Sequence, residues 1–110
     1  MSYHPFKDAA VRRTWLQRLI AEHGNACWLC GLVLPEATGM TVERPWATTF
    51  DHVIPRSRGG ASTYENFRLA HSFCNHRRAC GELTRELTAQ LRRQLPRWIR
   101  SLQDRDLRND

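Results

Sequence analysis

The sequence predicts a small α+β fold in which two short strands and a helix surround metal ligands, with further helices on either side. Three observations in its 110 residues support this fold class. Segments 48–54 and 67–70 are short and carry residues that favour strands. Segments 8–23 and 82–102 instead repeat apolar residues at helical spacing. Two pairs of potential metal ligands, each with two residues between its members, lie between these segments.

The first helix is expected over residues 8–23, with Gly24-Asn25 ending it. The arginines lie on its other faces, so we expect its apolar stripe to pack into the core rather than to bind a partner. That stripe consists of Val11, Trp15, Leu16, Leu19 and Ile20. Residues 1–6 are expected to form an irregular arm ahead of the helix.

A metal-binding turn is predicted directly after the first helix. Cys27 and Cys30 have two residues between them and a glycine after the second, so two thiolates on one tight turn face one ion. A thioredoxin-like redox pair is the alternative, but the strand–helix–strand context that it needs is missing.

Residues 32–47 contain two prolines and one glycine without a clear period, which predicts a loop with room for a short strand. Trp46 in this loop is expected in the core.

The central segment is expected to form two strands and a helix. The first strand is predicted at 48–54 and the second at 67–70. A flexible basic turn at 56–60 follows the first strand, and its two glycines allow the backbone to approach a phosphate closely. A short helix is predicted at 72–79, and Gly81 ends it.

A second amphipathic helix is predicted at 82–95. It carries four leucines at a spacing of four residues, Leu83, Leu87, Leu91 and Leu95. We expect this stripe in the core rather than in a zipper, because such a spacing drifts around the helix. Pro96 is expected to kink the helix or begin another segment, and the charged tail 104–110 is expected to fray.

The net charge of +6 lies entirely in the second half of the chain. Residues 1–55 carry five basic and five acidic groups, whereas residues 56–110 carry twelve arginines against six acids. Such a distribution favours a polyanionic partner, most simply nucleic acid, over arginines that only solubilise helix faces. Candidate phosphate contacts lie in the basic turn and on the short helix, namely Arg56, Arg58, Arg77 and Arg78.

The length and the cysteine usage bound the class of protein. A chain of 110 residues suits one domain with a modest core. The N-terminus lacks a basic region followed by an apolar run, and no segment reaches the length of a membrane span. We therefore expect a soluble cytoplasmic protein without a membrane partner. In that setting four cysteines favour metal binding over disulfides.

Candidate catalytic groups lie in the central segment. Asp51 and Asn75 offer a carboxylate and an amide oxygen, which suit a hard cation such as Mg²⁺ that keeps several waters. His52 offers an imidazole that can accept a proton near neutral pH. Because neighbouring side chains of a strand point to opposite faces, Asp51 and His52 serve one site only if the backbone bends or the ion lies over the strand edge.

These residues carry a resemblance. The stretch Asp51–Arg78 resembles the HNH nuclease family, whose fold is the ββα-metal, or His-Me finger, core. The matching elements are Asp51-His52, Pro55, Gly59-Gly60, Asn66 and Cys74-Asn75, with Cys27-x-x-Cys30 upstream as in the zinc-bearing members. The combination is specific because several spaced elements must coincide.

The resemblance implies a role for each site residue. His52 would be the general base, and Asp51 and Asn75 would hold one Mg²⁺ or Mn²⁺ ion. Asn66 would pin the loop and orient His52. The last histidine of the family's name falls near His76, which is a second candidate ligand for the same ion.

The predicted structural zinc site departs from the family's commoner pattern. Its zinc-bearing members usually show C-x-x-C twice, whereas here His71 stands in place of one cysteine beside Cys74. Together with Cys27 and Cys30, these two residues form a tetrahedral ligand set of three cysteines and one histidine. Cys80 is the alternative to His71, but the pair spacing favours His71 and leaves Cys80 as a buried thiol.

The resemblance predicts a metal-dependent DNA endonuclease of the HNH type. It would form one domain over 1–110, with a core at about 26–81 between the helices at 8–23 and 82–102, and act on duplex DNA with weak sequence preference. The alternatives are a zinc-containing nucleic-acid-binding module without cleavage and an HNH nuclease that acts on RNA. Small members occur in phages, prophages and restriction systems. The sequence does not decide between packaging and restriction partners, nor does it fix the oligomeric state.

Overall fold

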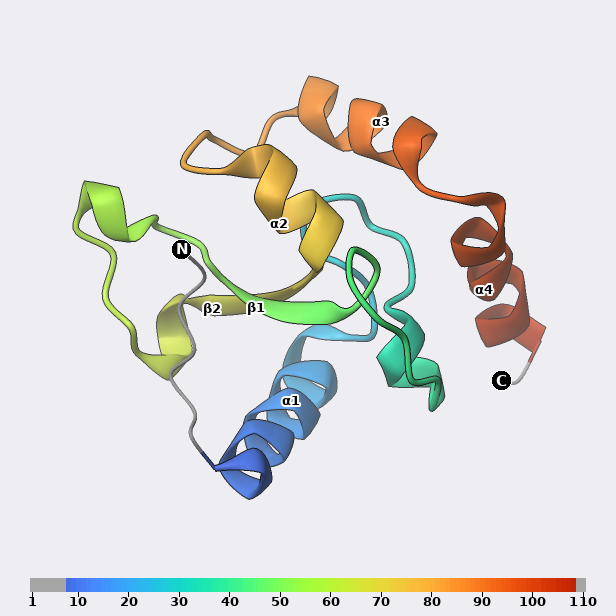
Figure 1. Cartoon of the computed structure of the whole chain (residues 1–110), viewed down its shortest axis with the longest axis horizontal. Helices are drawn as coiled ribbons and strands as arrows, with labels where there is room; N and C mark the ends of the chain where they lie inside the picture. Colours follow the sequence, from blue (N-terminus) through green and yellow to red (C-terminus); the bar gives the residue numbers. More distant parts are fainter. Residues whose placement is uncertain (1–7, 109–110) are drawn as a thin grey trace.

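The computed structural model describes the backbone of residues 8–108 and the side chains of residues 8–102. Within this range it shows the predicted α+β fold, a two-stranded antiparallel sheet with helices around it (Figure 1). The helices and strands are α1 Ala9–His23, β1 Thr48–His52, β2 Phe67–His71, α2 Ser72–Arg78, α3 Arg85–Gln94 and α4 Arg97–Arg108. None of the described helices combines the length and apolar character that crossing a bilayer requires. The arm predicted at 1–6 lies outside the described residues.

The sheet is the hairpin formed by β1 and β2, and its register places Asp51 opposite Arg68. β1 is two residues shorter than the predicted 48–54. The reason is that the backbone N–H of Ile54 donates to the side-chain oxygen of Asn66, at 2.9 Å, instead of continuing the ladder. β2 ends one residue later than predicted.

α1 packs on the sheet. The Asp8 carboxylate accepts a hydrogen bond from the backbone of the first turn at 2.8 Å, and the helix ends at Gly24 with φ of 90°. The ring of Trp15 lies against that of Phe67, with 5.8 Å between centroids. Val11 is exposed, but the rest of the apolar stripe lies in or against the core, which confirms the core role predicted for this helix.

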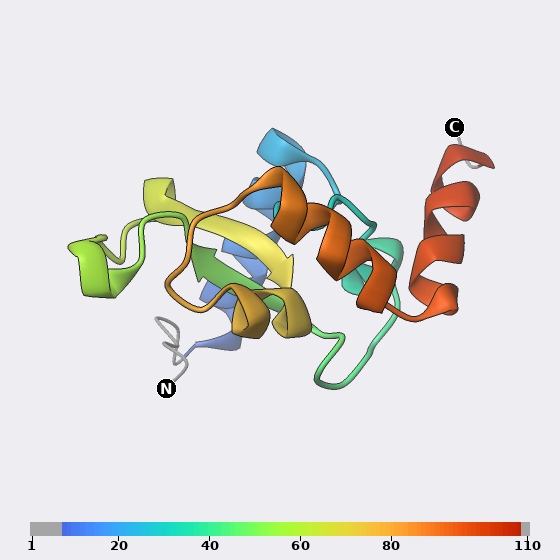
Figure 2. The same ribbon diagram turned by 90° about the horizontal axis from the view of Figure 1, so that it is seen from above.

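α2 crosses the face of the sheet that is opposite α1 (Figure 2). It ends at Arg78, one residue earlier than predicted, because Ala79 adopts a positive φ of 51° that a helix cannot contain. Gly81 closes the turn by donating its N–H to the Arg78 carbonyl at 2.9 Å. The short helix therefore stops abruptly beside the end of β1.

The predicted helix at 82–95 begins later than expected. The Thr84 hydroxyl accepts a hydrogen bond from the backbone N–H of Leu87 at 3.1 Å, so Thr84 caps the helix and α3 starts at the next residue. Leu83 lies outside the helix and is 40% exposed, which corrects its prediction as a core residue.

Pro96 separates α3 from α4, as predicted. Leu91 and Ile99, one on each side of it, are buried and fix both helices to the core. The backbone of the tail is helical as far as Arg108 rather than frayed, and residues 109–110 lie outside the described range. α4 lies at the opposite end of the molecule from the loop that joins β1 and β2, and α3 leads towards it (Figures 1 and 2).

The loop predicted at 32–47 forms a 3-10 turn at Pro35–Thr38 and no strand. An isolated antiparallel β-bridge between Ala26 and Val33 closes the Cys27–Cys30 turn, which precedes this loop. Trp46 packs on the ring of Phe73, with 5.3 Å between centroids, and lies against the core as predicted.

Candidate metal centre and active site

Four potential metal ligands converge between the sheet, α2 and the turn after α1. The ligand atoms of Cys27, Cys30, His71 and Cys74 all lie within 4.8 Å of one another, and all four side chains are buried. The two cysteines of the turn are brought together by the backbone hydrogen bond from Gly31 to Cys27, at 2.8 Å. His71 is the last residue of β2, and Cys74 lies in the first turn of α2.

The distances within this cluster suit one tetrahedral zinc ion. Typical zinc–sulfur and zinc–nitrogen bonds place two such ligand atoms about 3.6 Å apart. The His71 Nδ1 lies 3.5 Å from the Cys30 Sγ and 3.7 Å from the Cys74 Sγ. The other ring nitrogen, Nε2, lies 3.1 Å from the carbonyl of Val33 and donates to it, which leaves Nδ1 as the ligand atom.

The pKa values of the cysteine thiols show how the cluster depends on a bound cation. Burial raises the pKa of the Cys27 thiol, but hydrogen bonds from Cys30 and Cys74 outweigh it and hold that pKa well below its usual value. The same contact with Cys27 raises the pKa of Cys30 to about 12. Without an ion the cluster is therefore one thiolate held between two thiols, and holding all three cysteines as thiolates would require a divalent cation to balance their charges.

Cys80 is not part of the cluster. It is exposed beyond the end of α2, whereas the other three cysteines are buried. Its prediction as a buried thiol is thereby wrong, because α2 ends before Cys80 can turn towards the core. The geometry leaves His71 as the partner of the three buried cysteines.

Asp51 lies at the end of β1, on the face of the sheet that α2 covers. Its carboxylate is buried and accepts two hydrogen bonds on Oδ2, from the Trp28 indole at 2.9 Å and from Arg78 Nη1 at 3.1 Å. Burial raises the pKa of Asp51, and these two partners oppose that effect. In the described structure no side chain donates to the second oxygen, Oδ1.

His52 is partly exposed on the opposite face of the sheet. Its ring lies on Phe67, with 4.6 Å between centroids, and its Nε2 lies 3.1 Å from the Ser62 hydroxyl. Burial, followed by the positive charge of Arg56, lowers the pKa of His52. A neutral imidazole near pH 7 is the form that a general base requires. Ser62 was not singled out from the sequence, where a serine two residues after a glycine pair carries no signal.

Asn66 spans the loop between the two strands. Its side-chain amide donates to the carbonyls of Ile54 and Ala61, at 3.0 and 2.8 Å, while its oxygen accepts from the Ile54 N–H. Gly60 fits beside them only because it has no side chain, since a Cβ there would lie 1.7 Å from the Ile54 oxygen. The loop that follows His52 is thus held in one shape.

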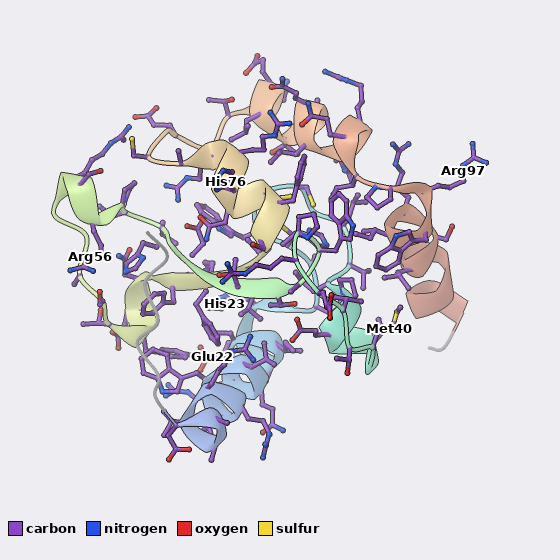
Figure 3. All side chains as sticks on the ribbon, in the orientation of Figure 1. Glu22, His23, Met40, Arg56, His76 and Arg97 are labelled. Carbon is purple, nitrogen blue, oxygen red and sulfur yellow. The ribbon has the colours of Figure 1, made fainter. Side chains whose placement is uncertain are left out.

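The predicted ligands on α2 differ in exposure. Asn75 is half-buried and lies three residues before Arg78, on the same side of α2. His76 (Figure 3) is exposed, and so is Arg77. The only group of three or more potential ligands that converges among the described residues is the cysteine and histidine cluster, which contains neither Asp51 nor His76.

Arg78 does not lie where the sequence predicted it. Only 3% of its side chain is exposed, and it bonds inward to Asp51 and to backbone carbonyls, so it cannot contact a nucleic acid from the surface. The other predicted phosphate contacts, Arg56, Arg58 and Arg77, are exposed. Arg56 lies in the loop beyond β1 (Figure 3), and Arg58 is 3.7 Å from the carboxylate of Glu82.

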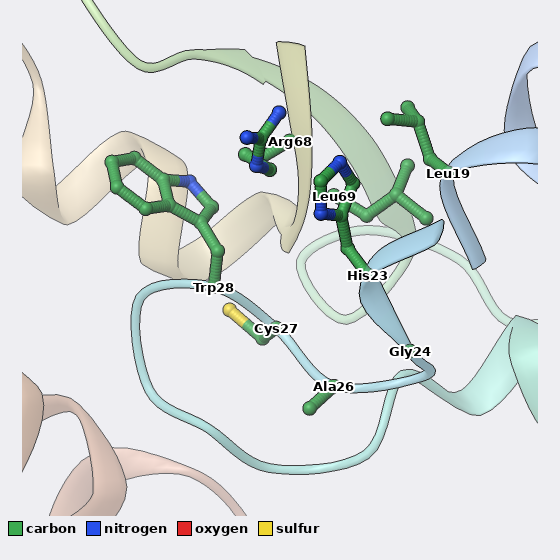
Figure 4. Close-up of a pocket in the computed structure, with 8 residues that line it drawn as sticks. All are labelled: Leu19, His23, Gly24, Ala26, Cys27, Trp28, Arg68 and Leu69. Carbon is green, nitrogen blue, oxygen red and sulfur yellow. The ribbon is translucent and has the colours of Figure 1, made fainter. Parts of the chain in front are cut away.

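A pocket of about 280 Å³ opens beside the cysteine cluster (Figure 4). Apolar and aromatic side chains line it together with two basic ones, and the lining residues are Leu19, His23, Gly24, Ala26, Cys27, Trp28, Arg68 and Leu69. Neither Asp51 nor His52 lines it, although Trp28, whose indole donates to Asp51, does.

Residues 37–79 match the family model described as HNH endonuclease. We call this stretch the HNH segment. It covers most of the loop after the Cys27–Cys30 turn, both strands and α2, but not the turn itself, and it confirms the resemblance predicted for Asp51–Arg78. The two-stranded sheet, α2 and the cluster of three cysteines and His71 are consistent with the ββα-metal fold. Neither a curated protein nor a solved structure matches the chain. The HNH segment indicates a nuclease-type function that involves nucleic acid and a divalent metal.

Proposed function

We propose that the protein is a metal-dependent DNA endonuclease that hydrolyses phosphodiester bonds, with His52 as the general base and one divalent cation held by Asp51 and Asn75. The observation that carries the proposal is the arrangement at the end of β1 within the HNH segment. A partly exposed imidazole, kept neutral by burial and Arg56, directly follows a buried carboxylate.

Each residue of the proposed site would have its own role in the hydrolysis. His52 accepts a proton from the attacking water, and the hydroxyl of Ser62 at 3.1 Å restrains its ring. Asp51 and Asn75 would hold Mg²⁺ or Mn²⁺, which neutralises charge on the phosphate and on the leaving oxygen. Asn66 fixes the loop after His52 through its three hydrogen bonds. His76, exposed beside Asn75, is the second candidate ligand.

The cluster of Cys27, Cys30, His71 and Cys74 is proposed to hold a structural zinc ion. All four ligands are buried, which leaves no open coordination position for a substrate or an activated water. The cluster joins the turn after α1 to the sheet and α2. Zinc would therefore stabilise the fold on which the proposed active site is built.

DNA is the proposed substrate, in duplex form and with weak sequence preference. Arg56, Arg58 and Arg77 are exposed, and the charge of Arg56 acts on His52. Further exposed arginines lie on α3 and α4. Arg97 projects from α4 away from the rest of the molecule (Figure 3). Contacts of this kind are made to phosphates and carry little sequence information.

One observation favours a second candidate, a zinc-containing nucleic-acid-binding module without cleavage. The Asp51 carboxylate already has the Arg78 guanidinium 3.1 Å away, which weakens its attraction for a cation. A cleavage assay separates the two functions. The endonuclease should cut supercoiled plasmid with Mg²⁺ or Mn²⁺ and lose this activity in EDTA. A matched RNA substrate in the same assay tests whether the nuclease acts on RNA instead. Binding to DNA without cutting in any of these metals would favour the module.

His71 rather than Cys80 is expected to complete the zinc set. His71→Cys should keep one zinc per chain and the fold, because four cysteines are an equally tetrahedral set. His71→Ala should weaken zinc binding, whereas Cys80→Ala should not, since Cys80 is exposed outside the cluster. Zinc content and a chelator competition measure both effects. The reverse ranking of the two alanine variants would transfer the ligand role to Cys80.

Binding to DNA is expected to weaken steeply with salt, because arginines that neutralise phosphates release condensed counterions. Arg93→Gln and Arg97→Gln should lower the slope of log affinity against log salt by about 0.9 for each phosphate that the variant no longer neutralises. Both side chains are exposed. Gln94→Ala, exposed on the same helix end, is the matched control. An affinity that stays constant from low to moderate salt would contradict electrostatic binding.

Cleavage should depend on pH through His52. Its pKa is lowered by burial and by Arg56, so the base stays unprotonated, and cleavage persists, to a more acidic pH than an ordinary imidazole would allow. Below the folded-state pKa the rate should fall. Arg56→Gln removes one of the two causes and should move this fall to higher pH. Single-turnover rates at saturating DNA measure the shift, and an unchanged profile would exclude Arg56 as its cause.

A further inference from the structure

The Arg78 side chain makes four hydrogen bonds, and three of them go to the end of β1. Its Nη1 donates to the Asp51 carboxylate at 3.1 Å and to the His52 carbonyl at 2.7 Å. Its Nη2 donates to the Val53 carbonyl at 2.6 Å, and its Nε donates to the Gly81 carbonyl at 3.0 Å. Every nitrogen of the guanidinium is therefore used, and three of the four acceptors are consecutive residues at the end of β1.

The surroundings of this guanidinium are built to hold it. One face lies 5.0 Å from the centre of the Trp28 ring, and the indole N–H of the same residue donates to the carboxylate oxygen that Arg78 contacts. The chain also accepts backbone strain at this point. Ala79 has a φ of 51°, which turns the backbone so that Gly81 meets the Arg78 side chain. Such strain persists only where the surrounding contacts impose it.

We propose that Arg78 is a positioning residue of the proposed nuclease site, which fixes Asp51 and the backbone of His52 and Val53 and tempers the attraction of Asp51 for a divalent cation. The inference rests on the proposed function. It assigns Arg78 no contact with the substrate, because only 3% of its side chain is exposed.

Two properties of arginine carry the argument. The planar fork offers donors in fixed directions, so one side chain can hold a carboxylate and two carbonyls in a fixed arrangement, which the single ammonium of lysine cannot do. The guanidinium also keeps its charge, and it is the cation nearest to Asp51 among the described residues. Trp28 contributes a neutral donor to the same oxygen. A divalent ion at Asp51 would therefore bind against the positive charge of Arg78.

The geometry and charge effects are separable by substitution. Arg78→Lys keeps the charge and loses the fork, whereas Arg78→Met keeps most of the side-chain volume and loses both. Arg78→Met should lower the melting temperature by roughly 10 °C or more, because it leaves a buried carboxylate unpaired. Arg78→Met combined with Asp51→Asn should melt higher than Arg78→Met alone, since no unpaired buried charge then remains.

The test measures zinc content, melting temperature, Mn²⁺ binding without DNA, and cleavage at saturating DNA. Arg78→Lys should fold with one zinc per chain, yet cut at least about tenfold more slowly, consistent with the loss of a well-placed general base. It should also show a changed Mn²⁺ half-saturation. Arg13→Lys, an exposed arginine on α1 outside the proposed site, is the control and should match the wild type.

Each outcome decides the proposal. If Arg78→Lys lowers the melting temperature but leaves Mn²⁺ binding and the rate per folded molecule unchanged, Arg78 is a stabilising residue only and the inference is wrong. If Arg78→Met does not fold, Arg78→Lys alone decides. If the wild type does not cleave DNA, the proposed function fails, but melting and Mn²⁺ binding still test whether Arg78 acts on Asp51.

Discussion

Cys27→Ser should leave the chain unfolded or insoluble, and Cys74→Ser should do the same. Both side chains are buried in the cluster whose ligand atoms lie within 4.8 Å of one another. In small zinc domains the metal contributes about 10–16 kcal/mol, whereas a whole domain is stable by only about 5–15 kcal/mol. Losing the ion therefore removes an amount of free energy comparable to the entire stability of the fold.

Circular dichroism and zinc analysis of purified protein measure this effect. Cys80→Ser is the matched control, because it removes the one cysteine that is exposed and outside the cluster. It should keep one zinc per chain and the wild-type spectrum. A Cys27→Ser protein that is well folded and free of metal would show that the cluster does not support the fold through a metal ion.

The sequence predicted the parts of the fold that depend on neighbouring residues. The hairpin, α2 and the ligand pairs follow from short apolar runs, glycine turns and fixed spacings. The leucine spacing places the start of α3 too early, because it takes no account of the capping signal. The Thr84 hydroxyl accepts a hydrogen bond from the Leu87 N–H and so fixes where the first turn of α3 begins. Leu83 lies before that turn and is exposed. A Ser or Thr ahead of a periodic segment is the local signal that marks this start.

The direction of the two arginines on α2 was the main error about the site. Both were predicted as phosphate contacts, but only Arg77 is exposed. A helix places residues four apart on one side, so Arg78 follows the buried Cys74 inward. That signal was present in the sequence. The partners of Arg78 were not predictable in the same way, because Trp28 and Asp51 reach it only through the tertiary fold.

The positions of Asp51 and His52 show what strand alternation alone could not settle. The two side chains do lie on opposite faces, Asp51 towards α2 and His52 over Phe67. The hydrogen-bond ladder between the strands stops directly after His52, where the side-chain oxygen of Asn66 accepts a hydrogen bond from the Ile54 N–H. One site served by both residues would therefore have to lie over this end of the strand, whereas the sequence predicted either a bent backbone or an ion over the strand edge.

His52→Ala should abolish most cleavage while leaving zinc, fold and DNA binding intact. Removing a general base typically costs roughly a hundred- to ten-thousandfold in rate. The fold should tolerate the change because the imidazole is partly exposed and its contacts include the Ser62 hydroxyl, which can turn to water. The rate should be measured as a single turnover at saturating DNA, in a preparation shown to be free of contaminating nuclease.

Asp51→Asn separates loss of the base from loss of the cation. The amide oxygen can still accept from Trp28 and Arg78, so the fold should survive, but the negative charge that attracts the ion is gone. Raising the Mg²⁺ or Mn²⁺ concentration should partly restore cleavage by Asp51→Asn and should not restore cleavage by His52→Ala, because no added metal replaces a missing proton acceptor. Wild-type cleavage by His52→Ala would refute the proposed mechanism. If neither variant nor the wild type cuts, the binding module would take its place.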